Sequence, residues 1–288
     1  MIKVSLNENM KIHSNKIGID MGQTLSKLVY LDNNEIILNS FPTSESISII
    51  KNFLDSKKEK VSNICFTGGK CFPLYQEFSK KTDSILIDEF EANAKGVEFL
   101  YRLEKNKDLS RSLIVTIGTG TSILLKDREF EHIGGSALGG GFFMGIMKLI
   151  SGEQDFHKAV NLAKKGVRYN LDLKVSDIYE PEDTRVDLLF REFTAASLGK
   201  ITKNFNMKNL KLEDFLNSFI CLIGENLGTI AILMASNRNV TEIVFSGGFL
   251  RDNKVLQKIL FMMCKINQKK AIFLKNSEFS AAIGAMII

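Results

Sequence analysis

The residues with the clearest chemical potential lie in short loops that follow apolar strands. IGIDMGQTLSKLVY (17–30) carries a carboxylate, Asp20, into a turn that contains Gly22 and Thr24, and Lys27 follows on the next strand-like run. Glycine lets backbone N–H groups approach phosphate oxygens, and a Thr hydroxyl adds a donor. A carboxylate contacts phosphate favourably only across a cation, so Asp20 indicates a Mg²⁺ site in which a water molecule lies between the carboxylate and the ion.

This hairpin has a counterpart later in the chain. LIVTIGTGTSILL (113–125) has the same strand–turn–strand pattern, with Gly118, Thr119, Gly120 and Thr121 in the turn. Small residues in the turn are typical of a β-hairpin whose backbone can approach a ligand.

A second loop also occurs twice. NICFTGGK (63–70) and EIVFSGGFL (242–250) are apolar strands that end in Thr or Ser followed by a glycine pair, which is Gly247 and Gly248 in the second copy. Glycine pairs are common turn formers, so one match would carry little weight. Two different loops that recur in the same order indicate a duplicated domain.

A third glycine segment, IGGSALGGGFFMG (133–145), directly precedes a helical pattern. Its glycines carry a high chain-entropy cost, which close approach of a ligand or an anion at a helix N-terminus would explain. Any one of these loops could be only a tight turn, with Asp20 as its cap. The whole set favours phosphate binding.

The elements that must position these loops alternate between strand and helix. Strands are predicted at 61–66, 84–88, 113–117 and 242–246, and helices at 91–105, 157–166 and 214–236. This alternation is typical of an α/β fold. The polar stretch EKNKDLS (104–110) after a helix places a boundary there, which gives domains 1–108 and 109–288.

Composition restricts the class of protein. The 288 residues are 44% hydrophobic and 25% charged, as in an ordinary globular chain of one large or two smaller domains. The formal charge of +5 comes from scattered lysines, with no basic arm, so we expect no nucleic-acid partner and a mild preference for an anionic substrate. The four cysteines lack metal-binding spacing and are expected to be free thiols in a reducing cytoplasm.

Two segments bear on targeting. Residues 1–14 lack the apolar core and cleavage pattern of a signal peptide, so we expect a frayed tail or a short lead-in to the first strand. The segment 218–236 is apolar but carries Glu225 and Asn226 at its centre. It is therefore predicted to be a buried core helix, with no membrane span.

Taken in order, these stretches resemble bacterial type II pantothenate kinases. The similarity rests on IGIDMGQTLSKL, FTGGK, IDEFEANAKG (87–96), VTIGTGTSILL, IGGSALGGGFFMG, GVRYNLDLKVSDIY (166–179), FTAASLGK (193–200), VFSGGFLRDN (244–253) and FSAAIGAMI, which span nearly the whole chain. These kinases belong to the superfamily of acetate and sugar kinases, heat-shock protein 70 and actin. The resemblance implies two related ribonuclease H-like α/β domains with ATP in the cleft between them.

The resemblance also implies site residues. The family's base falls on Glu89, which would accept the proton of the substrate hydroxyl, although Asp88 and Glu91 are close alternatives and a plain helix-starting role is possible. ATP and Mg²⁺ would be held by Asp20, Gly22, Thr24, Lys27, Gly118, Thr119, Gly120, Thr121, Gly139, Gly140, Gly141, Gly247 and Gly248, with the last two near adenosine. Pantothenate would meet His132, Gly134, Gly135 and Ser136.

Three positions depart from the family pattern. His132 stands where an arginine reaches the substrate, and an imidazole ring cannot make the same bidentate contact as a guanidinium. Gln23 adds bulk where the first loop often has glycine, and Val167 replaces a common acidic residue. Together they favour an altered acceptor preference or weakened activity.

The family further implies a homodimer formed through helices of the second domain. The segment 214–236 is a candidate for that surface, and plain core is the equal alternative. The rival functions are a kinase for pantetheine or an N-acetylhexosamine on the same fold, and a nucleotide-binding regulator without turnover.

Overall fold

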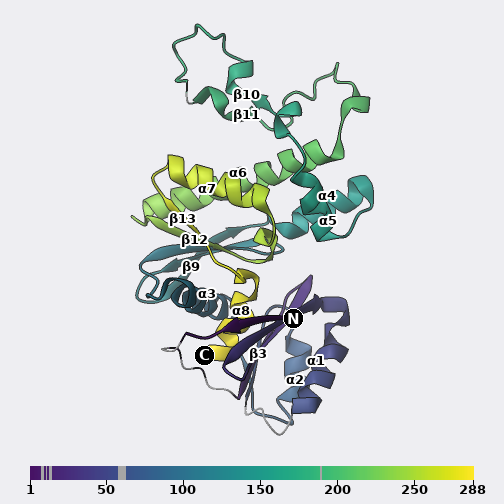
Figure 1. Ribbon diagram of the computed structural model, residues 1–288, viewed down its shortest axis with the longest axis vertical. Helices are drawn as coiled ribbons and strands as arrows, with labels where there is room; N and C mark the ends of the chain where they lie inside the picture. The colour runs from purple at the N-terminus through teal and green to yellow at the C-terminus, as the bar shows by residue number, and fades with distance from the viewer. Residues whose placement is uncertain (8–9, 11, 13–14, 58–62, 189) are drawn as a thin grey trace.

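Two sheets with matching strand order organise the chain (Figure 1). The computed structural model describes residues 1–7, 10, 12, 15–57, 63–188 and 190–288. The first sheet has the order β1-β4-β3-β2-β5-β6 and contains β1 (Ile2–Ser5), β2 (Lys16–Met21), β3 (Leu25–Asp32), β4 (Glu35–Pro42), β5 (Asn63–Thr67) and β6 (Ser84–Leu86). The second has the order β13-β12-β7-β8-β9 and contains β7 (Ser112–Ile117), β8 (Thr121–Lys126), β9 (Phe130–Ser136), β12 (Glu242–Ser246) and β13 (Lys270–Phe273).

The duplication read from the loops is present in the topology. Each sheet contains three antiparallel strands linked by hairpins, β2-β3-β4 in the first and β7-β8-β9 in the second. Two further strands extend each sheet beyond the first of these three, and the nearer one pairs with it in parallel. The glycine turns and glycine pairs therefore occupy matching places in the two halves. The predicted α/β fold with two related domains is confirmed.

Helices cover both faces of these sheets. They are α1 (Thr43–Lys57), α2 (Phe72–Phe78), α3 (Glu89–Lys105), α4 (Gly140–Ser151), α5 (Phe156–Ala163), α6 (Leu212–Asn237), α7 (Lys254–Ile266) and α8 (Ser280–Ile287). Figure 1 shows α3 and α8 between the two sheets, α1 and α2 on the outer face of the first, and α6 and α7 on the outer face of the second. Alternation along each strand supplies the two faces.

The described elements differ from expectation at several ends. The strand predicted at 84–88 stops at Leu86 because Asp88 is already the N-cap of α3. The helix predicted at 157–166 stops at Ala163, and a Cβ on Gly166 would lie 1.9 Å from the Glu213 carbonyl oxygen, so that glycine serves a close approach to α6. Positions 61–62 of the predicted first parallel strand lie outside the described residues.

The expectation of a frayed tail or lead-in at residues 1–14 is wrong for its first part. Ile2–Ser5 forms β1, which pairs antiparallel with β4 in register Ile2↔Leu38. Its alternating residues pack against the cluster shared by the two halves, and this burial explains why so short an edge strand forms. Residues 8–9, 11 and 13–14 of that segment lie outside the described residues.

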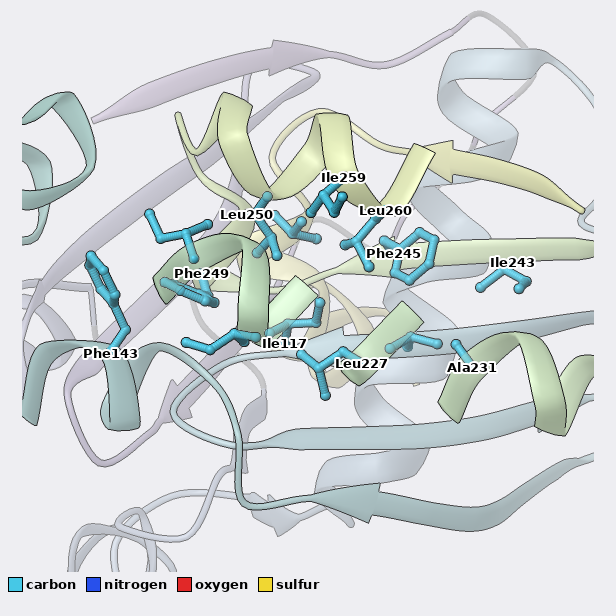
Figure 2. Packing of buried hydrophobic residues seen from close by; sticks show 14 of the residues in the cluster. Ile117, Phe143, Leu227, Ala231, Ile243, Phe245, Phe249, Leu250, Ile259 and Leu260 are labelled. Atoms are coloured by element: carbon cyan, nitrogen blue, oxygen red, sulfur yellow. The ribbon is translucent and has the colours of Figure 1, made fainter. Parts of the chain in front are cut away.

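The largest apolar cluster among the described residues lies between the outer face of the second sheet and the helices that cover it (Figure 2). Ile243 and Phe245 of β12 pack there with Leu227 of α6 and Leu260 of α7. Helix α6 is long and apolar enough to cross a membrane by composition, yet 61% of its most apolar window is buried in this structure. That burial fits the predicted core helix. The four cysteines are free and buried, as expected.

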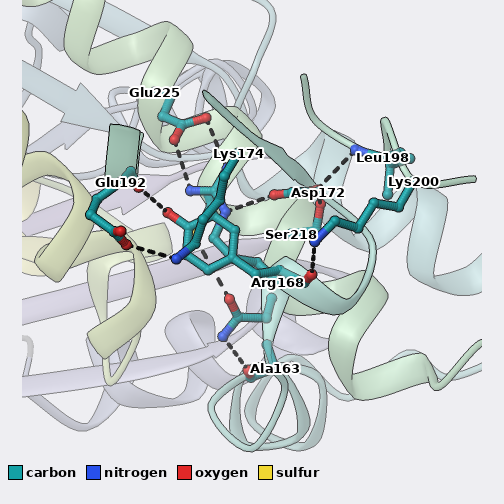
Figure 3. A network of polar contacts seen from close by, with 12 residues as sticks. Ala163, Arg168, Asp172, Lys174, Glu192, Leu198, Lys200, Ser218 and Glu225 are labelled. Atoms are coloured by element: carbon teal, nitrogen blue, oxygen red, sulfur yellow. Dashed lines mark hydrogen bonds and ion pairs between the residues drawn. The ribbon is translucent and has the colours of Figure 1, made fainter. Parts of the chain in front are cut away.

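A lobe between α5 and α6 projects away from both sheets (Figure 1). It contains β10 (Leu173–Lys174), β11 (Thr194–Ala196) and short 3-10 turns. Its base is fixed by Arg168 (Figure 3), which donates to Asp172 Oδ2 at 2.7 Å and to both carboxylate oxygens of Glu225 at 2.7 and 3.1 Å. Burial alone would lower the pKa of Arg168, but the two carboxylates outweigh it and raise that pKa.

The two inner helices touch through glycine. A Cβ on Gly96 of α3 would lie 1.7 Å from the Ser280 carbonyl oxygen, and one on Gly284 of α8 would lie 1.6 Å from the Ala92 carbonyl oxygen. A Cβ on Gly18 of β2 would lie 1.9 Å from the Ala282 carbonyl oxygen. Backbone therefore packs on backbone where α3, α8 and the first sheet meet.

Gly96→Ala should destabilise the protein by about 3 kcal/mol, because neither helix backbone can move aside without disturbing both sheets. Thermal unfolding measures the change as a fall in Tm. The matched control is Gly145→Ala in α4, where no atom lies within 4 Å of the added Cβ and alanine should stabilise the helix by about 0.5–1 kcal/mol. Equal Tm values for the two variants would contradict the close packing described here.

Candidate active site

The tips of the two glycine hairpins converge between the sheets. In the first turn the Gly22 amide donates to the Leu25 carbonyl oxygen at 3.2 Å, and in the second the Gly118 amide donates to the Gly120 carbonyl oxygen at 2.8 Å. The hydroxyls of Thr24 and Thr119, one from each tip, are 3.4 Å apart. Loops that are 95 residues apart in the chain thus face a common space.

An ion pair lies close to the turn of the first hairpin. Asp20 and Lys27 are register partners on β2 and β3, and Lys27 Nζ lies 2.7 Å from Asp20 Oδ2. Both side chains are largely buried, and Asp20 is only 4% exposed. A Cβ on Gly68, whose φ is +89°, would lie 2.5 Å from Asp20 Oδ1, so only glycine fits beside this carboxylate.

The start of α3 brings a second carboxylate to the same place. Asp88 is the N-cap and accepts hydrogen bonds from the Phe90 and Glu91 amides at 2.9 and 3.0 Å. Glu89, the first residue of the helix, lies near the Gly69 amide, which acts to lower the pKa of the Glu89 carboxyl. Among the three neighbouring acids, Asp88 is therefore engaged in capping and Glu89 faces the Asp20–Lys27 pair.

The surroundings of Glu89 raise its pKa above the ordinary value of 4.5. Partial desolvation by the protein around it is the largest cause, and the negative charge of Asp20 adds to it. Lys27 and the Gly69 amide act in the opposite direction. The side chain still reaches solvent, so it is a carboxylate that water or a ligand can contact.

The glycine pairs after β5 and β12 have the same two roles in both halves. Gly68 and Gly247 have positive φ values and pack against the preceding hairpin strand, since a Cβ on Gly247 would lie 2.5 Å from the Ile117 carbonyl oxygen. Gly69 and Gly248 have no atom within 4 Å of an added Cβ. Each pair thus presents one tightly packed glycine and one that opens onto free space.

The glycine triplet at the start of α4 packs on the second hairpin. The amides of Gly140 and Gly141 donate to the carbonyl oxygens of Gly118 and Thr119 at 2.8 and 3.0 Å. A Cβ on Gly139 would lie 2.7 Å from the Thr119 carbonyl oxygen. Close contact between the two loops therefore explains why glycine occupies these positions. That the three glycines also approach a ligand stays a prediction.

A cavity of about 500 Å³ lies just beyond Gly248 along the chain. Apolar side chains of β12 and β13 form part of its wall, and charged groups surround them. The lining is Ile2, Phe245, Leu250, Arg251, Asp252, Lys254, Gln257, Phe273, Leu274, Lys275, Asn276, Ser277 and Glu278.

His132 of β9 stacks on Phe90 of α3. Their ring centroids are 4.3 Å apart, and the planes differ by 22°. This contact links the two halves of the molecule beside Glu89. A flat, exposed aromatic pair thus lies at the start of α3, one residue after Glu89 in the chain.

Comparison with known proteins assigns this geometry to a family. The chain matches the family model described as Fumble over residues 34–288. It is 34% identical over 277 residues to the type II pantothenate kinase of Bacillus cereus (strain AH820), covering 94% of this chain and 96% of that one. The type II pantothenate kinase of Oceanobacillus iheyensis is 32% identical over 272 residues, covering 94% and 98%. The chain belongs to the type II pantothenate kinase family.

Solved structures agree on the fold of this type II pantothenate kinase family member. Component A of (R)-2-hydroxyglutaryl-CoA dehydratase from Acidaminococcus fermentans is similar with a TM-score of 0.60 at 17% identity, covering 94% of this chain and 96% of that one. A ROK family glucokinase from Streptomyces griseus, solved with glucose and AMPPNP, gives 0.52 at 12% identity, covering 94% and 97%. The resemblance read from the motifs is confirmed, and the chain is a kinase of the actin-like ATPase fold.

The remaining predicted site residues of this pantothenate kinase family member are dispersed along β8 and β9. Thr121 donates to the Leu138 carbonyl oxygen at 2.7 Å, and Ser136 accepts from the Leu138 amide at 3.1 Å. A Cβ on Gly134 would lie 2.7 Å from Met234 Cε, and one on Gly135 would lie 2.5 Å from the Thr121 carbonyl oxygen. These four positions shape the strand, and of the predicted acceptor residues His132 lies against α3.

Sequence reasoning missed two groups beside Glu89. Phe90 follows it directly and contributes the stacking surface, and Asn93 lies one turn further along α3 and is buried. The signal for Asn93 was available, because an amide between Ala92 and Ala94 interrupts the apolar pattern of that helix. Nothing in the sequence marked Phe90 as different from a core aromatic.

The raised pKa of Glu89 can be measured directly by carbon-detected NMR titration of its carboxyl group. Asp20→Asn should lower that pKa because it removes a negative neighbour, and Lys27→Met should raise it further because it removes the positive one. Glu77 is the internal control, since its lowered pKa depends on hydrogen bonding to Lys51 and should not move. Shifts of the same sign in both variants would contradict the arrangement.

Proposed function

We propose that this chain transfers the γ-phosphoryl group of ATP to the primary hydroxyl of pantothenate, giving 4′-phosphopantothenate in the first step of coenzyme A biosynthesis. Family membership over nearly the whole chain supports the substrate. The placement of Glu89 beside the Asp20–Lys27 pair, between two glycine hairpins, carries the chemical part of the proposal.

Glu89 is the base of this reaction. Its carboxylate takes the proton of the pantothenate hydroxyl as that oxygen forms a bond to the γ-phosphorus, while the bond from that phosphorus to the bridging oxygen of ADP breaks. A raised pKa makes the carboxylate a stronger proton acceptor, yet it must be ionised to act. Turnover therefore falls as the pH drops through the raised pKa.

The hairpins bind the phosphates. Lys27 supplies positive charge, and Thr24 and Thr119 supply hydroxyl donors from the two tips. Gly22, Gly118, Gly120, Thr121 and the triplet Gly139, Gly140 and Gly141 complete the phosphate loops, and the open face of Gly248, with Gly247 behind it, lies toward adenosine. Phosphoryl transfer depends mostly on such positioning and charge neutralisation.

The donor set is suited to Mg²⁺. This ion keeps several waters and binds through one or two carboxylates together with substrate phosphates. Asp20 offers one buried carboxylate at the hairpin, and no cluster of three or more His, Cys, Asp or Glu side chains occurs among the described residues. Asp20 would hold the ion, which neutralises phosphate charge when bound, and Lys27 would turn toward the phosphates.

The acceptor end is built from His132 and Phe90, with Gly134, Gly135 and Ser136 further along β9. The stacked pair gives a flat apolar surface and no guanidinium for the pantothenate carboxylate. This observation favours, as the second candidate, a kinase for a related acceptor without that carboxylate, such as pantetheine. Gln23, exposed at the hairpin tip, and Val167, exposed at the base of the lobe, are the other departures that would tune activity.

We place the enzyme in the cytoplasm as a homodimer of two-domain chains, 1–108 and 109–288, that pair through second-domain helices including α6. Exposed Leu233 on α6 and Phe261 on α7 support that surface. The scattered lysines and the buried α6 support the absence of nucleic-acid and membrane partners.

An ADP-release assay tests the function. The wild-type protein should turn over pantothenate faster than pantetheine or N-acetylglucosamine, and Glu89→Gln should lower kcat by about 10²–10⁴-fold because an amide cannot accept the proton. Glu91→Gln, two residues away on the exposed face of the same helix turn, is the matched control and should retain activity. Turnover that survives Glu89→Gln would overturn the base, and ATP binding without turnover on any acceptor would favour the regulator.

His132→Arg should lower the KM for pantothenate by about tenfold, or ~1.4 kcal/mol, because a guanidinium can pair with the carboxylate of pantothenate. Pantetheine, in which that carboxyl is an amide, serves as the control substrate and should keep its KM. If the KM for pantothenate does not change, the acceptor is held by other residues.

A further inference from the structure

Four polar side chains, three of them buried and Thr116 partly buried, form a continuous hydrogen-bonded chain between the two halves of the molecule. Ser280 Oγ donates to Asn93 Oδ1 at 2.5 Å, and Asn93 Nδ2 donates to Thr116 Oγ1 at 2.5 Å. Thr116 Oγ1 lies 2.9 Å from Ser246 Oγ and, having accepted from Asn93, can donate its own proton to Ser246. Asn93, Ser246 and Ser280 are each at most 5% exposed.

The members of this chain stand next to the functional loops. Asn93 lies one helical turn after Glu89 on the same face of α3. Thr116 comes two residues before Gly118, and Ser246 comes immediately before Gly247. The amide of Asn93 thus joins the helix that carries the carboxylate to both strands that carry the nucleotide loops of the second half.

The matching position in the first half of the molecule carries a different residue with a different contact. In the first sheet, Asp20 is the register partner of Thr67, the residue before Gly68. In the second sheet, Thr116 is the register partner of Ser246, the residue before Gly247. Thr116 therefore takes the place that Asp20 has in the first half, and it contacts α3 where Asp20 contacts Lys27.

We propose that Asn93 is a positioning residue that sets the distance and angle of Glu89 relative to the second phosphate hairpin. Both ends of its amide are bonded, one to α8 and one to β7, so rotating or sliding α3 breaks a buried hydrogen bond. An unpaired buried amide is costly, and this cost confines α3 to one placement. The inference rests on the proposed function, in which Glu89 must meet a γ-phosphate held by the hairpins.

Steady-state kinetics of Asn93→Ala and Thr116→Val test the proposal. Each should lower kcat about 10–100-fold while the KM values for ATP and pantothenate stay within about threefold, because misplacement affects the reacting geometry and leaves the ligand contacts. In a Glu89→Gln background, Asn93→Ala should have no further effect on residual turnover, since the group it positions is gone.

Asn217→Ala is the matched control. Asn217 is a partly buried amide on α6 that donates to the Ala163 carbonyl oxygen at 2.9 Å, away from α3. It should lower Tm without lowering kcat. A fall in kcat that follows Tm equally in all three variants, or an unchanged kcat in Asn93→Ala and Thr116→Val, would overturn the proposal.

Hydrogen exchange separates failure of the positioning role from failure of the proposed function. When AMPPNP binds the second half, exchange of the amides in the first turns of α3 should slow in the wild-type protein and not in Thr116→Val. Equal slowing in both would overturn the positioning role whatever the acceptor is. Loss of turnover on every acceptor, with this difference retained, would overturn the proposed kinase reaction alone.

Discussion

The fold depends on the contact between α3 and α8. These helices lie between the two sheets, and at Gly96 and Gly284 they approach so closely that a single methyl group would overlap a carbonyl oxygen. Because backbone cannot change shape as a side chain can, this contact fixes where α3 begins. The position of Glu89 therefore depends on backbone packing at Ala92 and Gly96, within two helical turns of it, together with the hydrogen bonds of Asn93.

Around that fixed point the site is electrostatic. Asp20, Lys27 and Glu89 come from three different elements, and two negative charges share one positive neighbour in a partly desolvated space. Such a cluster is unbalanced by itself and is ready to accept additional cationic charge. The conformational constraint on α3 and the charge at its start are thus two parts of one arrangement.

Much of this was accessible from the sequence, because the determinants are local. Repeated glycine turns and glycine pairs encode the duplicated topology, and β12 was predicted to the residue at 242–246. The contacts that complete the site were not accessible, since they join residues far apart in the chain. Phe90 meets His132 only after the halves pack, and Thr116 meets Asn93 across the same interface.

Some predictions failed for identifiable physical reasons. Ile2–Ser5 has no strand signal strong enough to separate it from a tail, and it becomes a strand because β4 offers an open edge and the shared cluster offers apolar partners. The helix predicted at 157–166 ends at Ala163 instead, and Gly166 is explained by a close approach to the Glu213 backbone. In both cases the deciding neighbour lies elsewhere in the chain.

The placement of α8 has a consequence for how the molecule is made. Its residues come after the whole second half in the chain, yet they pack against β2 and α3 of the first half. During synthesis the inner face of the first sheet therefore stays uncovered until residues 280–287 have been made and have left the ribosome. The first half is therefore completed last. Until then Gly18 and its apolar neighbours are exposed, and during this interval the nascent chain most needs protection from aggregation.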